Sequence, residues 1–480
     1  MSTIDHFSTA TAMLAALRAR EISSVELAEL HIARIEALDP PLNAIPIHTF
    51  ERAREAARAA DARLAAGETA PLLGLPMTLK ESTLTAGLPQ SAGIEALAGH
   101  VPAQDGPIAR AVFDAGAALL GKTNIPVALG DWQADSPVYG RTNNPWDTTR
   151  TPGGSTGGGG AALAAGFTPL EVGSDIGGSI RVPAAYCGVF GHRPTETAIP
   201  RTGAFPFADL PNPTALLGVQ GPLARCTDDL ELLFDVLAGP EDGEHVGWRL
   251  DLPPPRATAL GDFRVALCPP LPGVTASRAM RDALARLADQ LSDAGARVET
   301  PDLPMVFEDY FADYLRILTV MINQGTPAED RHAMAASLRE SDDPVRRAQA
   351  EGLVMDAPGY IMAAHRRAAA QAAWRRFFED WDIVAAPMVP DVAFPHQTGA
   401  MADRTLTIDN ESVNYFANIL YPMLAIFPGL PSTAFPAGRS AEGLPVGLQA
   451  IGPYLEDRTP MAFARALEAE GWAFTPPPGY

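Results

Sequence analysis

The chain has 480 residues, of which 47% are hydrophobic and 19% are charged, a composition typical of a globular protein rather than a disordered one. Its formal net charge of −21 argues against nucleic acid or an anionic membrane as a partner. No apolar run approaches the roughly 20 residues of a membrane span, and residues 1–6 show no basic region followed by an apolar core, so we expect neither a transmembrane helix nor a secretory signal.

The first part of the chain alternates between predicted helices and strands. Ser23 and Glu26 have the spacing of a capping box, which marks the start of a helix. In chain order, the next expected elements are a helix over 48–66 that ends before Gly67, a buried strand over 75–79, a helix over 108–115 and a strand over 117–120. This alternation predicts an α/β fold with a mixed sheet.

The pattern becomes weaker after residue 179. The expected elements are a strand over 263–267, an amphipathic helix over 278–291, a strand near Val298, a strand over 382–387, a hairpin over 429–452 and a final helix over 457–470. Residues 305–380 are helical but irregular, and we interpret them as a cap or pocket insertion. No repeat and no linker marks a boundary, so we expect a single domain over 1–480 with an N-terminal helical segment over 1–70.

Two short motif matches indicate functions that their surroundings argue against. Residues 116–123 match the phosphate-binding loop, but Ala-Ala-Leu-Leu between its glycines predicts a buried strand. Residues 153–157 match G-x-S-x-G, but polar residues 147–152 precede them where a nucleophile elbow needs a buried strand. The nine histidines contain no H-E-x-x-H and the three cysteines no C-x-x-C, so we expect no metal site and no cofactor.

The three cysteines, Cys187, Cys226 and Cys268, are far apart in the sequence. An odd and sparse set of cysteines is typical of a reducing compartment and not of a disulfide framework. We therefore expect a cytoplasmic protein without disulfides.

Lys80, Ser155 and Ser179 are the candidate catalytic residues. Lys80 follows the apolar run 75–79, so its amine either reaches solvent or is buried as a neutral base, and the sequence leaves both alternatives open. Each serine lies among glycines, which let the backbone approach a substrate and let successive amides converge on one oxygen. A serine in such a loop can attack a carbonyl, and the amides beside it can hold the resulting oxyanion.

Asp175 and Arg181 flank Ser179 and are candidate supporting residues. Their opposite charges either brace the loop as an ion pair or are ordinary surface charges.

Together the motifs resemble those of the amidase signature family. The resemblance is carried by T-P-G-G-S-T-G-G at 151–158, G-S-D-I-G-G-S-I-R-V-P-A-A at 173–185 and C-G-V-F-G at 187–191, with shorter matches at 79–81, 121–124, 142–146 and 443–449. It covers roughly residues 20–460 and implies a single α/β/α domain around a large mixed twisted sheet, with the catalytic signature core at 74–200. Ser174 stands where the family commonly has threonine.

The resemblance implies a Ser-Ser-Lys triad. Carried over by position, Ser179 is the nucleophile, Ser155 on a cis peptide bond relays the proton, and Lys80 is the base. We therefore expect the Lys80 amine to touch the hydroxyls of both serines. The implied oxyanion hole consists of the backbone amides of Ile176, Gly177, Gly178 and Ser179.

Candidate substrate-binding residues are Gly130, Asp131, Gln133 and Met388. Six apolar residues either line a pocket or pack in the core, and core packing is the simpler interpretation for most of them: Trp132, Phe205, Phe207, Met388, Phe394 and Phe416.

The expected function is hydrolysis of the carbon–nitrogen bond of a linear amide through a Ser179 acyl-enzyme. One alternative is a urethanase or aryl acylamidase that cleaves carbamates or anilides. A second alternative is the catalytic subunit of a tRNA-dependent amidotransferase complex, although the negative charge argues against direct contact with tRNA. The expected partner is a small-molecule amide or carbamate substrate, not nucleic acid or a membrane, and the expected state is a monomer or homodimer.

Overall fold

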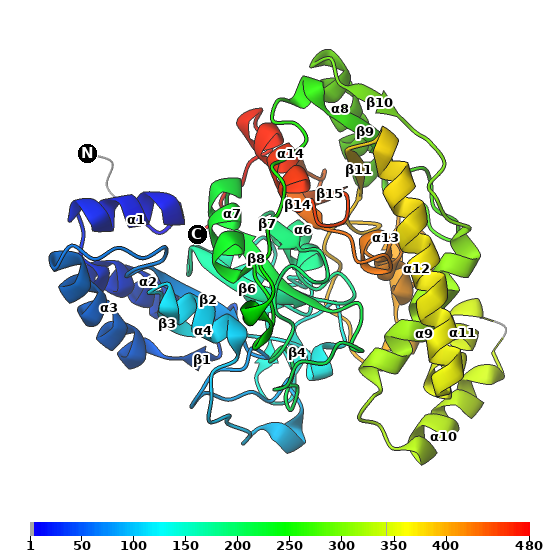
Figure 1. Ribbon diagram of the computed structural model, residues 1–480, viewed down its shortest axis with the longest axis horizontal. Helices are drawn as coiled ribbons and strands as arrows, with labels where there is room; N and C mark the ends of the chain where they lie inside the picture. The colour runs from blue at the N-terminus through cyan, green and yellow to red at the C-terminus, as the bar shows by residue number, and fades with distance from the viewer. Residues whose placement is uncertain (1–3, 342) are drawn as a thin grey trace.

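A mixed sheet of eleven strands runs through the centre of the computed structural model, which describes residues 4–341 and 343–480 (Figure 1). The strand order is β1-β3-β2-β6-β8-β7-β14-β15-β11-β9-β10. These strands are β1 (Ile47–His48), β2 (Pro76–Lys80), β3 (Ala118–Thr123), β6 (Leu170–Asp175), β7 (Phe190–Arg193), β8 (Val219–Ala224), β9 (Arg264–Leu267), β10 (Arg297–Glu299), β11 (Ile383–Pro387), β14 (Ser432–Arg439) and β15 (Pro445–Ile451).

The sheet combines parallel and antiparallel pairs. β2 runs parallel to β3 and β6, and β9 runs parallel to β10 and β11. The neighbours from β6 through β8, β7, β14 and β15 to β11 are antiparallel. Two further pairs lie outside the sheet: β4 (Asp135–Ser136) with β5 (Gly140–Arg141), and β12 (Thr405–Ile408) with β13 (Glu411–Asn414). The predicted mixed α/β fold is confirmed.

Helices pack around the sheet, and groups of them lie at both ends of the molecule. They are α1 (Ala10–Ala19), α2 (Ser24–Leu38), α3 (Phe50–Ala65), α4 (Pro107–Asp114), α5 (Gly157–Ala164), α6 (Arg181–Cys187), α7 (Thr227–Leu237), α8 (Arg278–Asp293), α9 (Phe307–Ile322), α10 (Ala328–Arg339), α11 (Pro344–Leu353), α12 (Ala357–Asp380), α13 (Met423–Ile426) and α14 (Arg458–Ala469). Figure 1 shows α1–α3 at one end of the molecule and α9–α12 at the opposite end.

The local sequence signals define several of these elements correctly. α2 begins after Ser23, whose hydroxyl accepts from the Glu26 amide while the Glu26 carboxylate accepts from the Ser23 amide, so the predicted capping box is present. The match to a phosphate-binding loop falls on β3, in which every residue is buried. The strand prediction for 117–120 is therefore confirmed.

The long segment 305–380 contains the four helices α9–α12, as its composition suggested. Its function as a cap or pocket wall stays a prediction. No sequence signal predicted the short hairpin of β12 and β13, which leads directly into Tyr415.

Within residues 4–341 and 343–480, all three cysteines are free thiols. In the same residues, no helix combines the length and the apolar character that crossing a bilayer requires.

Candidate active site

Lys80 ends β2 in the interior of the protein, with none of its surface exposed. Its Nζ atom donates to Ser155 Oγ at 2.6 Å and to Ser174 Oγ at 3.0 Å. The alternative in which the amine reaches solvent is therefore wrong. The contact with Ser174 was not predicted, and its only signal in the sequence was the position of Ser174 where the family commonly has threonine.

The buried position changes the acidity of Lys80. Burial disfavours the ammonium form and lowers the pKa of Lys80 from 10.5 to about 7, although the carboxylates of Asp175, Glu171 and Glu81 act in the opposite direction. A substantial fraction of the Lys80 amine is therefore neutral at neutral pH, which is the form that can accept a proton.

The two glycine-rich serine loops lie against each other. The peptide bond between Gly154 and Ser155 is cis, as the resemblance implies. The Thr156 amide donates to the Ser179 carbonyl at 3.2 Å, which joins the two loops directly. Ser155 and Ser179 are 1% and 6% exposed, so Ser179 retains a little access to solvent. α5 starts two residues after Ser155.

Only one of the two contacts expected for the Lys80 amine is present. Lys80 bonds to Ser155, but its second partner is Ser174 and not Ser179. The physical reason is that Ser174 belongs to β6, the strand next to β2, whereas Ser179 lies beyond the end of β6. The structure thus brings all three predicted residues into one region, and of the two candidate serines it is Ser155 that contacts the lysine.

Asp175 and Arg181 form a buried ion pair. Arg181 Nε lies 3.0 Å from Asp175 Oδ2, and both side chains are fully buried, so the surface-charge alternative is wrong. Burial by itself raises the pKa of Asp175, but Arg181, Arg193 and the hydrogen bonds to the carboxylate outweigh it and hold the pKa below its ordinary value. Arg181 also donates to Gln449 Oε1 at 2.7 Å, which ties the Ser179 loop to β15.

One predicted oxyanion donor is already engaged. The Gly178 amide donates to Asp175 Oδ1 at 2.9 Å, so its inclusion in the hole needs correction. Among the residues that the structure describes, none accepts a hydrogen bond from the amides of Ile176, Gly177 and Ser179. Their use by a substrate oxygen stays a prediction.

The predicted substrate-binding residues have partners inside the protein. Asp131 accepts from Tyr415 Oη at 2.6 Å and from Arg404 Nη1 at 2.5 Å. The side-chain amide of Gln133 exchanges two hydrogen bonds with the backbone of Gln397.

The position of this segment relative to the serine loop is fixed by close backbone packing. A Cβ atom added at Gly154 would lie 2.8 Å from the Gln133 carbonyl oxygen, so residues 131–133 lie directly against the serine loop. Gly130 is exposed, whereas Met388 is fully buried. A direct contact of these residues with substrate stays a prediction.

The six apolar candidates fall into different environments. Trp132, Met388 and Phe394 are buried, and Phe205 and Phe416 are half-buried. Phe207 is 70% exposed, so it belongs neither to the core nor to an enclosed pocket. Trp132 packs against Tyr415 and Phe416, with ring centroids 5.4 and 6.0 Å apart.

Known proteins share both the sequence pattern and the fold of this chain. The family model named Amidase matches residues 26–460. The chain belongs to the amidase family. It is therefore an enzyme that acts on the carbon–nitrogen bonds of amides.

Three relatives illustrate the range of this amidase family. The chain is 34% identical to an indoleacetamide hydrolase of Bradyrhizobium diazoefficiens, over 92% of this chain and 83% of that protein. It is 32% identical to a glutamyl-tRNA(Gln) amidotransferase subunit of Methylococcus capsulatus, over 99% of each. The crystal structure of a bacterial aryl acylamidase of the amidase signature family superposes with a TM-score of 0.82 at 25% identity, covering 99% of each chain.

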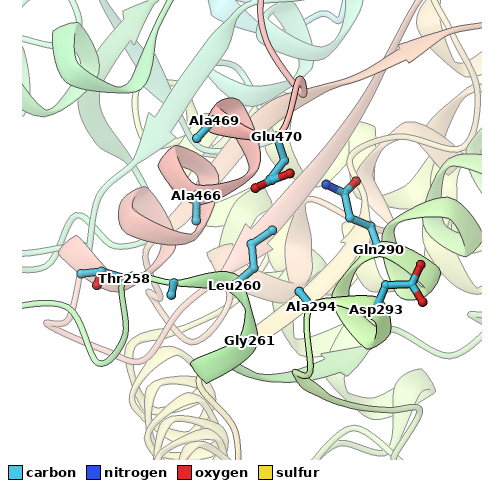
Figure 2. A pocket seen from close by; sticks show the side chains of 10 residues that line it. Thr258, Leu260, Gly261, Gln290, Asp293, Ala294, Ala466, Ala469 and Glu470 are labelled. Carbon is cyan, nitrogen blue, oxygen red and sulfur yellow. The ribbon is translucent and has the colours of Figure 1, made fainter.

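Two cavities of this amidase are lined by none of the three candidate triad residues. Figure 2 shows the smaller one, of about 520 Å³, whose walls come from the Leu260 turn and from the ends of α8 and α14. The larger one, of about 850 Å³, is lined in part by Phe394, Thr405 and Asn418. Across the described ranges 4–341 and 343–480, no group of three or more histidine, cysteine, aspartate or glutamate side chains is placed to hold a metal ion.

Proposed function

We propose that this amidase hydrolyses amides through an acyl-enzyme on Ser179, with Ser155 as the proton relay and Lys80 as the base. The observation that supports this most strongly is the 2.6 Å contact between the fully buried Lys80 amine and Ser155 Oγ, on a loop that is hydrogen-bonded to the backbone of Ser179. Serine becomes a good nucleophile only when a base removes its proton.

In the first half of the reaction, Ser179 Oγ attacks the carbonyl carbon of the amide. The proton of Ser179 passes to Ser155, and the proton of Ser155 passes to the neutral Lys80 amine. The substrate oxygen takes up negative charge and accepts hydrogen bonds from the amides of Ile176, Gly177 and Ser179. The Gly178 amide takes no part because Asp175 occupies it.

In the second half, the proton returns from Lys80 through Ser155 to the leaving nitrogen. The C–N bond breaks, the amine leaves, and the acyl group remains as an ester on Ser179. Water then attacks this ester, and the same relay takes one proton of the water. When the ester C–O bond breaks, this proton returns from Lys80 through Ser155 to Ser179 Oγ, and the carboxylic acid leaves. The same relay can serve every step because it accepts a proton when a nucleophile attacks and donates a proton when a group leaves.

An aromatic amide is the substrate class that we propose. Two similar proteins are named for acting on indoleacetamide and on aryl acylamides. Trp132, Tyr415 and Phe416 form an aromatic group that reaches the nucleophile's loop through the hydrogen bond from Trp132 Nε1 to the Gly177 carbonyl. Carbamates, which differ by one oxygen next to the carbonyl, are the alternative within the same mechanism.

A substrate panel with the purified wild type and Ser179→Ala tests this proposal. The panel contains indoleacetamide, a p-nitroanilide, an aryl carbamate and a simple primary amide. We expect turnover of at least one aromatic amide, and we expect Ser179→Ala to lose both turnover and covalent labelling by a fluorophosphonate probe. Wild-type turnover in Ser179→Ala would show that the acyl-enzyme mechanism is wrong.

A second candidate function is that of one chain in an amidotransferase complex. The 32% identity to a glutamyl-tRNA(Gln) amidotransferase subunit over 99% of both chains favours it. A free hydrolase turns over amides as a purified single chain. A member of such a complex instead needs partner chains and ATP, so activity that appears only when the chain is co-purified with them would favour this function.

A further inference from the structure

Two carbonyl groups of the nucleophile's loop are held by side chains that lie far away in the sequence. Tyr314, on α9, donates its hydroxyl to the Ile176 carbonyl at 3.1 Å. Trp132 donates its indole N–H to the Gly177 carbonyl at 2.9 Å. These carbonyls belong to the two consecutive peptide units that link Ile176, Gly177 and Gly178.

A trans peptide unit is planar, and its C=O and N–H groups point in opposite directions. The first unit turns its carbonyl to Tyr314 and thus turns the Gly177 amide away from α9. In the described part of the chain this amide donates no hydrogen bond. The second unit is fixed at both ends, because its carbonyl bonds to Trp132 and its Gly178 amide bonds to Asp175. The direction of the free Gly177 amide therefore depends on these side chains.

The side chains of Tyr314 and Trp132 are both held in place by the residues around them. Tyr314 is fully buried, and burial raises its pKa above the ordinary value for tyrosine, so the hydroxyl keeps its proton at neutral pH. Trp132 packs against Tyr415, and Tyr415 in turn bonds to Asp131, the neighbour of Trp132 in the chain. Tyr415 therefore contacts the Trp132 ring and also bonds to the residue that precedes Trp132.

We propose that Tyr314 and Trp132 are positioning residues of the oxyanion hole, which aim the Gly177 amide at the substrate oxygen by holding the Ile176 and Gly177 carbonyls. This inference rests on the proposed acyl-enzyme mechanism. Neither side chain touches the reacting atoms. When Tyr314 is lost, the first unit, which carries the Gly177 amide, can rotate. When Trp132 is lost, the second unit keeps only its bond to Asp175 and anchors the adjoining first unit less firmly. In both cases the Gly177 amide is misaligned.

The test compares Tyr314→Phe and Trp132→Phe with two matched controls. Tyr310→Phe removes a buried hydroxyl of the same helix that bonds to the Leu424 carbonyl at 2.9 Å. Trp146→Phe removes an indole donor that bonds to the Cys187 carbonyl at 2.9 Å. Each control loses the same kind of hydrogen bond but leaves the oxyanion loop untouched.

We expect kcat to fall about ten- to a hundredfold in Tyr314→Phe and Trp132→Phe, because loss of an oxyanion donor costs on the order of 100- to 1000-fold and misalignment costs part of this. KM should change by less than about threefold, since the ground-state carbonyl depends little on the hole. The affinity for an aryl trifluoromethyl ketone should fall in parallel with kcat. Ser179 adds to this ketone, and the resulting hemiketal oxygen occupies the hole. The midpoint of thermal unfolding should fall no more than in the controls.

The outcome separates this inference from the proposed mechanism. If Ser179→Ala is inactive but Tyr314→Phe and Trp132→Phe lose no more kcat or ketone affinity than Tyr310→Phe and Trp146→Phe, the positioning role is wrong and the mechanism stands. If Ser179→Ala retains wild-type turnover, the mechanism itself fails.

Discussion

Replacing Lys80 by methionine removes the titrating amine but keeps an unbranched side chain of similar length in the buried site. In the folded protein the pKa of Lys80 is about 7, compared with 10.5 when it is solvated. At 1.36 kcal/mol per pH unit, this difference corresponds to about 5 kcal/mol in favour of the neutral amine. Because the unfolded chain binds the extra proton between these two pKa values, Lys80 makes the protein more stable as the pH rises from 7 to 10.5.

Urea unfolding at pH 7 and pH 9 measures this effect. We expect the free energy of unfolding of the wild type to increase between these pH values by about 2 kcal/mol more than that of Lys80→Met, because the titration of Lys80 is already half complete at pH 7. The other titrating groups are present in both proteins. Equal pH dependence of the two proteins would refute the neutral buried amine.

The same titration should appear in the kinetics. The value of kcat/KM should rise with pH through an apparent pKa of about 7 and level off above it, so that activity at pH 6 is about a tenth of the plateau. Lys122→Met is the control, since the buried Lys122 amine bonds to the carbonyls of Thr83 and Pro89 and not to a serine. It should keep this limb, whereas Lys80→Met should lose at least about a hundredfold in kcat/KM. A flat profile from pH 6 to pH 9 would contradict a lysine base. Two further substitutions test the supports of the site. Asp175→Asn leaves the buried Arg181 without its charge partner and should lower the free energy of unfolding by about 3–5 kcal/mol in urea titrations, and a loss below about 1 kcal/mol would contradict a stabilising role of the pair. Gly154→Ala brings a Cβ atom to 2.8 Å from the Gln133 carbonyl and should abolish amide turnover by displacing the serine loop, whereas Gly99→Ala, with nothing within 4 Å, should keep it. Equal turnover in both alanine variants would refute the close packing at Gly154.

The sequence predicted much of the framework because strands and helices leave local periodic signals. The apolar run before Lys80 forms β2, and the capping box at Ser23 starts α2. The glycine-flanked serines identified the two loops of the site. The same local signals could not decide whether the Lys80 amine is buried, because the residue ends its strand and its environment comes from β6 and the Ser155 loop.

The chain by itself thus indicated the fold class, through the alternation of predicted helices and strands, and the candidate residues Lys80, Ser155 and Ser179, through motifs that resemble those of the amidase signature family. Only the tertiary structure decided which groups meet. It placed the hydroxyl of Ser174 beside Lys80 and bonded the Gly178 amide to Asp175, so that this amide is not free for the oxyanion hole. It also brought Tyr314 to the Ile176 carbonyl, 138 positions away in the sequence. The periodicity of a helix shows which face is buried, but the partner of each buried donor depends on how distant elements pack together.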